Sequence, residues 1–66
     1  MKVYINNKEI DIFRGATILD AVRKYSPHSC RRVMNETLMV IDRFGNRTEP
    51  DGEPTEGQHF QLKMNK

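Results

Sequence analysis

Residues 3–10 read Val-Tyr-Ile-Asn-Asn-Lys-Glu-Ile, and residues 15–21 read Gly-Ala-Thr-Ile-Leu-Asp-Ala. The first segment is typical of a β-hairpin and the second of the start of a helix. Residues 2–6 and 9–13 are rich in β-branched and aromatic side chains, and the second run alternates apolar and acidic residues with the period of two of a half-buried strand. Because the Asn-Asn-Lys between them tolerates positive φ, the sequence predicts a tight hairpin.

A helix is predicted to begin at Ile18, after a capping residue. The hydroxyl of Thr17 can accept a hydrogen bond from the first helical turn, and the carboxylate of Asp20 favours the positive end of the helix dipole. Ile18, Val22 and Tyr25 follow at helical spacing, so one apolar stripe is expected to face the sheet.

A second short helix is predicted from about residue 28 to residue 34. Pro27 disfavours helical backbone in Ser26, which ends the first helix, and the same pair suits the start of another. Asn35 is expected to end this helix in the left-handed conformation. Three apolar side chains are expected to share its buried face: Cys30, Val33 and Met34.

The rest of the chain predicts two further strands. Residues 37–41 form the longest apolar run, without alternation, and are expected in the middle of the sheet. Residues 42–47 read as a turn and residues 49–57 as a surface loop. Residues 58–64 alternate again and form the closing strand, with Phe60, Leu62 and Met64 on one side. The first and last strands are expected to lie side by side in parallel.

Residues 3–10 followed by residues 15–21 resemble the opening of several β-grasp (ubiquitin-like) families. These are the sulfur-carrier proteins of thiamine and molybdopterin synthesis, the plant-type and hydrogenase-associated ferredoxins, and the TGS domains of tRNA synthetases and related regulators. Residues 56–60 resemble the segment before the last strand of the sulfur carriers. The resemblance implies an α+β fold with a mixed sheet packed on one main helix, in the order β-β-α-(short α)-β-β, and a single domain over residues 1–66.

The chemistry of these families is only partly represented. A sulfur carrier needs a terminal Gly-Gly, whereas this sequence ends Lys-Met-Asn-Lys. A relative of the sulfur carriers that has lost this tail, or whose tail has been truncated, is one alternative. A ferredoxin needs four cysteine thiolates, and Cys30 is the only cysteine. TGS domains bind RNA or protein through a surface and need no catalytic residue.

Length and composition argue against an enzyme. In a chain of 66 residues with 36% hydrophobic residues, a reaction pocket would remove core that the domain needs. Cys30 near His28 is the enzymatic alternative, and a core position for its thiol is favoured. His28 and His59 lack metal-ligand spacing, so we expect neither a metal nor a cofactor.

The charge pattern suggests where a partner binds. The net charge is +2, and no apolar run approaches a membrane span, so a cytoplasmic protein without membrane contact is expected. Residues 1–34 carry seven basic and three acidic side chains. Five residues are candidates for partner binding: Arg23, Lys24, Arg31, Arg32 and Phe44. For Phe44, folding back over the core is the alternative to anchoring a partner.

From the sequence we therefore expect a non-catalytic protein-binding or accessory module, linked to a redox or cofactor-related system as the resemblance implies. RNA or ribonucleoprotein binding through the basic helical face is an alternative. The sequence does not specify the oligomeric state.

Overall fold

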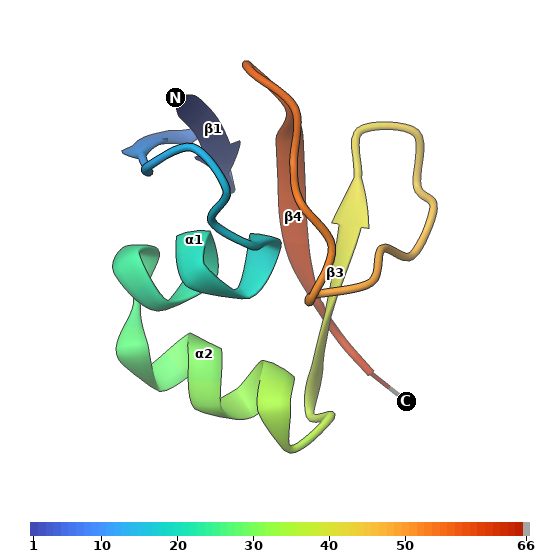
Figure 1. Cartoon of the computed structure of the whole chain (residues 1–66). Helices are drawn as coiled ribbons and strands as arrows, with labels where there is room; N and C mark the ends of the chain where they lie inside the picture. The colour runs from blue at the N-terminus through green and yellow to red at the C-terminus, as the bar shows by residue number, and fades with distance from the viewer. Residues whose placement is uncertain (66) are drawn as a thin grey trace.

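The predicted hairpin is present as β1 (Lys2–Ile5) and β2 (Lys8–Asp11) in a computed structural model that describes residues 1–65 (Figure 1). The two strands pair antiparallel. Both residues of the connecting turn have positive φ, 50° at Asn6 and 70° at Asn7, which matches the right-handed twist of the flanking strands.

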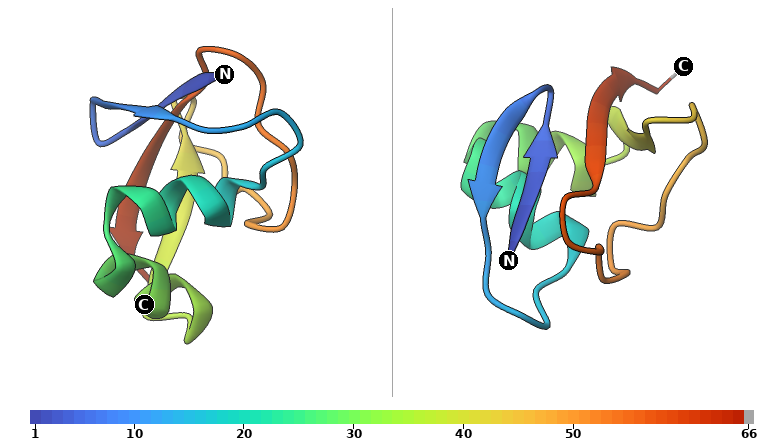
Figure 2. Two further views of the ribbon diagram at one scale, coloured as in Figure 1. Left: turned by 60° about the vertical axis from the view of Figure 1, so that its left-hand side comes forward. Right: turned by 90° about the horizontal axis from the view of Figure 1, so that it is seen from above.

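The two helices are α1 (Ile18–Tyr25) and α2 (Pro27–Met34), and both lie on one face of the sheet (Figure 2). Thr17 caps α1 and Ser26 caps α2, as the sequence predicts. The end of α2 differs from the prediction. Asn35 has φ −92°, and the left-handed residue is Glu36 with φ 66°, because Asn35 is the C-cap of α2 and the left-handed position of the closing motif follows the cap.

The sheet is mixed, with the order β2-β1-β4-β3. β4 (His59–Met64) lies between β1, to which it is parallel, and β3 (Leu38–Asp42), to which it is antiparallel. The expected parallel pairing of the first and last strands is therefore confirmed. The structure is α+β, with a four-stranded mixed sheet and two helices in residues 1–65.

The prediction that residues 37–41 form the middle of the sheet is wrong, because β3 is an edge strand. The chain after β3 folds back along this edge. Arg47 forms an isolated bridge with Ile41, and the Thr48 amide donates to the Val40 carbonyl at 2.9 Å. A run of apolar residues without alternation therefore does not distinguish a central strand from an edge strand that a following loop partly covers.

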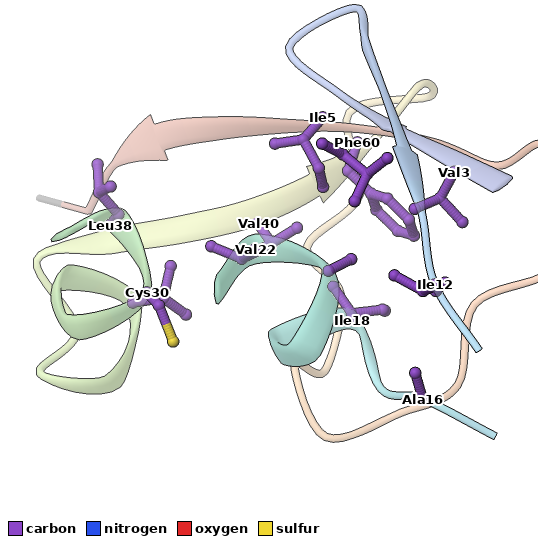
Figure 3. Packing of buried hydrophobic residues seen from close by; sticks show 13 residues of the cluster. Val3, Ile5, Ile12, Ala16, Ile18, Val22, Cys30, Leu38, Val40 and Phe60 are labelled. Carbon is purple, nitrogen blue, oxygen red and sulfur yellow. The ribbon is translucent and has the colours of Figure 1, made fainter. Parts of the chain in front are cut away.

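The core lies between the sheet and the helices (Figure 3). Its largest fully buried side chains are Phe60, Ile5, Val3, Val22 and Val40. Ile18 is also buried and Tyr25 packs against the core, so the predicted stripe of α1 faces the sheet.

Two large apolar side chains, those of Met34 and Met64, are more exposed than the sequence patterns indicate. Met34 is 63% exposed because the buried stripe of α2 runs through Cys30 and Val33, and Met34 lies at its margin. Met64, expected to share a buried side with Phe60, is 59% exposed because β1 pairs with β4 only as far as Phe60. Phe13, which follows β2, is 71% exposed.

Candidate protein-binding groove

A groove of about 360 Å³ lies between the end of α2, the outer edge of β3 and the loop of residues 47–51. Seven apolar residues contribute to its lining: Leu19, Val33, Met34, Leu38, Met39, Val40 and Pro50. The loop is fixed to the start of α1, where the Leu19 amide donates to the Pro50 carbonyl at 2.8 Å and the Ile18 amide to the Gly52 carbonyl at 2.9 Å. These bonds satisfy two amides that a helix start leaves unpaired, and they fix the loop beside the start of α1.

The edge of β3 is covered by the chain itself only over part of its length. The Asn65 amide donates to the Thr37 carbonyl, so the alternation of an antiparallel ladder turns the backbone groups of Leu38, Val40 and Asp42 away from β4. At one end of the edge, the following loop supplies partners for two of these groups. The Thr48 amide donates to the Val40 carbonyl, and the Asp42 amide donates to the Asn46 carbonyl.

Three backbone groups remain at the other end of this edge, beside the groove. They are the amide and carbonyl of Leu38 and the amide of Val40, which have no hydrogen-bond partner within residues 1–65. Both residues are buried, at 8% and 1% exposed, and Thr48 lies opposite Val40, so this part of the edge is not open to another extended chain.

The rim of the groove is mainly acidic. It carries the carboxylates of Glu36, Glu49 and Asp51 and a single guanidinium, that of Arg47. In the described part of the chain, none of these four side chains forms an ion pair. The rim therefore presents net negative charge to whatever enters the groove.

Most of the predicted basic residues contact the chain's own groups. Arg23 pairs with Asp20 at 2.9 Å, and the Lys24 ammonium donates to the Asp11 carbonyl. The guanidinium of Arg32, which is half-buried, contacts the sulfur of Met64 at 3.2 Å, whereas Arg31 is exposed. The structure thus distributes these cations over the ends of both helices and gives three of them intramolecular partners.

Phe44 is 78% exposed, so the alternative in which its ring folds back over the core is wrong. The turn that carries the ring is held by Asp42, whose carboxylate accepts the Phe44 and Asn46 amides, both at 2.9 Å. The guanidinium of Arg43 lies 6.0 Å from the ring centroid. Phe44 is not among the residues that line the groove.

The remaining candidates for chemistry are separated. Cys30 is 3% exposed, and α2 carries it as part of the buried cluster (Figure 3). His59 stacks on Tyr4 across the parallel strands, with ring centroids 4.4 Å apart, a pair that sequence reasoning missed because it depends on strand order. Within residues 1–65, no three His, Cys, Asp or Glu side chains are grouped as metal ligands would be, and no helix has the length and apolar character to cross a bilayer.

No family model, no curated protein and no solved structure matches this chain. The functional argument therefore depends on the residues and the geometry described above.

Proposed function

We propose that this chain is a β-grasp module without catalytic activity that binds another protein through the groove between α2 and β3. The strand order supports the β-grasp assignment, because the first and last strands, β1 and β4, are parallel neighbours, with β2 on one side of them and β3 on the other. The helices cover one face of that sheet, which is the arrangement that the resemblance implies.

The observation that carries the proposal is an apolar groove with an exposed methionine beside the outer edge of β3. Leu19, Val33 and Pro50 give the groove apolar surface that a partner side chain can bury. Met34 adds an exposed thioether, and a flexible methionine adapts to partners of different shape.

The acidic rim favours a protein over RNA as the partner. Glu36, Glu49 and Asp51 would face the phosphates of a nucleic acid laid in the groove, and like charges oppose each other there. On the helices, Arg23 and Lys24 already contact acceptors of the chain itself.

The test is a selection of displayed random peptides on the full chain, followed by mapping of the bound peptide by NMR chemical shifts. We expect shifts around Leu19, Val33 and Leu38, and a loss of affinity of about tenfold in Met34→Ala, because this variant removes apolar surface that a bound peptide would bury. Phe44→Ala is the matched control, since that side chain is also a large, exposed apolar one but lies outside the groove.

Three results would overturn the proposal. In the first, no peptide is selected. In the second, Phe44→Ala removes binding and Met34→Ala does not. In the third, the chain binds an RNA oligonucleotide with an affinity that falls steeply with salt and weakens in Arg31→Ala, which would establish the RNA alternative instead.

A further inference from the structure

We infer that the face of the sheet turned away from the helices carries a binding pocket for a phosphate monoester, the charged group of nucleoside and sugar phosphates. The pocket has a volume of about 300 Å³ and lies over β4, between the hairpin turn and the turn that follows β3. No described residue lines both this pocket and the groove between α2 and β3. The inference therefore goes beyond the proposed function and does not rest on it.

The pattern of β4 places polar side chains on this face. Phe60 is buried in the core, which lies between the sheet and the helices. Because side chains alternate along a strand, His59, Gln61 and Lys63 point to the opposite face. Both helices lie on the core side of the sheet, so neither covers these side chains (Figure 2). Gln61 and Lys63 are exposed, and a ligand can reach them from solvent.

The hairpin turn forms one wall of the pocket and is fixed to β4. The Asn6 amide donates to the Phe60 carbonyl at 3.0 Å, and the Leu62 amide donates to Asn6 Oδ1 at 3.1 Å. These bonds hold the adjoining Asn7 at the pocket, where it is exposed. The side-chain amide of an asparagine can donate hydrogen bonds to an anion.

The turn after β3 forms the opposite wall and supplies Arg43. This turn is held by Asp42, whose Oδ1 accepts the amides of Phe44 and Asn46 at 2.9 Å. Arg43 is exposed, and within residues 1–65 its guanidinium forms no ion pair. A guanidinium presents parallel N–H donors that match two oxygens of one phosphate.

The lining of the pocket has more positive than negative charge. Its cations are Arg43 and Lys63, and Lys63 likewise forms no ion pair in the part of the chain that the structure describes. Its one carboxylate is that of Asp42, and Oδ1 of this group already accepts the two amides of the turn. Two unpaired cations against one carboxylate favour an anion as the ligand.

His59 adds a hydrogen-bonding group whose position is fixed. Its ring stacks on Tyr4, with ring centroids 4.4 Å apart and the ring planes 10° from parallel. His59 lines the pocket and Tyr4 does not, so Tyr4 supports the imidazole from the side of β1. An imidazole has at least one N–H donor in either protonation state. The stacked pair thus has a role that binding at the groove does not give it.

Charge and size favour a small phosphate monoester over a nucleic acid. A monoester carries close to two negative charges at neutral pH, which match Arg43 and Lys63, whereas each phosphate of a nucleic acid strand carries one. The volume is at the lower end of the range for small-molecule sites. A strand continuing past His59 would meet the carboxylate of Glu56, which lines the adjoining hollow.

The test is a titration of the full chain with inorganic phosphate and with adenosine 5′-phosphate, followed by NMR of the backbone amides. Sodium chloride keeps the ionic strength constant, because screening alone also shifts signals of charged surfaces. We expect saturable shifts at Gly45, His59 and Gln61, which line the pocket. The signals of Leu19 and Val33, which line the groove, should stay unchanged.

Variants of exposed side chains separate a specific pocket from general attraction. Arg43→Gln and Lys63→Gln should each lower the affinity by about tenfold, because each removes a charge-assisted hydrogen bond. Arg43→Lys keeps the charge but loses the paired donors, so its loss should be smaller, about threefold. Arg31→Gln is the matched control. Arg31 is an exposed cation of α2 outside the pocket, and its loss should change the affinity by less than about twofold.

The inference is overturned in any of three cases. In one, the shifts with phosphate do not saturate or equal those with added chloride. In another, Arg31→Gln weakens binding as much as Arg43→Gln does. In the last, a thymidylate decamer without terminal phosphates binds more tightly than adenosine 5′-phosphate, which would identify a nucleic-acid surface. Met34→Ala should leave the affinity for phosphate unchanged, so failure of the proposed function and failure of this inference are separate results.

Discussion

The carboxylate of Asp20 both caps α1 and connects the stability of the protein to pH. Asp20 Oδ2 accepts from the Thr17 amide at 2.9 Å, and Thr17 Oγ1 accepts from the Asp20 amide at 3.1 Å. The backbone bond from Thr17 is the main cause that lowers the pKa of Asp20, followed by the Thr17 side chain and Arg23. Because the pKa is lower in the folded state, Asp20 stabilises the fold above its unfolded pKa, and this contribution is lost as the pH falls through the folded pKa.

We therefore expect Asp20→Asn to lower the free energy of unfolding at neutral pH and to reduce the loss of stability below about pH 4. Urea unfolding at a series of pH values measures both effects. Ser26→Ala is the control, because Ser26 caps α2 by accepting from the Ser29 amide at 3.1 Å, and α2 has no acidic residue in its first turn. It should cost about 1 kcal/mol. Curves for Asp20→Asn and the unchanged protein that stay parallel through the acid range would contradict the role of Asp20.

A second prediction at the residue scale concerns the thiol of Cys30. Since Cys30 is 3% exposed, a thiol reagent reaches it only when the core opens. We expect alkylation by iodoacetamide to be slow in the native protein and to accelerate with urea in parallel with unfolding. Labelling of the folded protein as fast as that of a free thiol would restore the nucleophile hypothesis for this residue.

At the scale of elements, α2 ends in a motif that normally uses glycine. The Thr37 amide donates to the Arg32 carbonyl at 2.8 Å and the Glu36 amide to the Val33 carbonyl at 3.1 Å, the two bonds of a Schellman motif, with Glu36 in the left-handed conformation. We expect Glu36→Gly to stabilise the protein by about 0.5 to 1 kcal/mol, measured by thermal unfolding.

The same substitution removes a carboxylate from the groove rim, so the affinity for a peptide that binds there through Lys or Arg should fall as stability rises. Asn35→Gly is the matched control: its φ is −92°, and its side chain accepts from the Thr37 amide, so this change should destabilise the protein. If Glu36→Gly is destabilising, the left-handed residue is not the source of strain.

Elements with local signals can be predicted from this sequence, whereas their order in the sheet is harder to predict. The Asn6-Asn7 turn and the caps at Thr17 and Ser26 depend on residues that are neighbours in the chain. The position of β3 depends on β4 inserting between it and β1, and the pattern of residues 37–41 does not contain that information. The groove was not predicted for the same reason, because helix, strand and loop form it together. The exposure of Phe44 was one of two alternatives, and the chain's own contacts of Arg23 and Lys24 require the folded geometry.

At the scale of the whole molecule, the two ends of the chain meet in the centre of the sheet. The Gly57 amide donates to the Lys2 carbonyl at 2.7 Å, and the Asn6 amide to the Phe60 carbonyl at 3.0 Å. Phe60 lies at this junction, 1% exposed, and packs with Val3 and Ile5 from the opposite end of the sequence. The core is therefore complete only when β4 is paired with β1.

This arrangement makes Phe60 and Phe44 a matched pair for testing where the stability resides. Phe60→Ala should cost about 3 to 5 kcal/mol, because it leaves a cavity at the junction of the chain ends. A domain of this length has a total free energy of unfolding on the order of 3 to 10 kcal/mol. The Phe60→Ala variant should therefore lose a large part or all of its stability. Phe44→Ala removes the same side chain from the surface and should change stability by no more than about 0.5 kcal/mol. Urea unfolding followed by circular dichroism measures both, and similar losses for the two variants would contradict a core centred on β1 and β4.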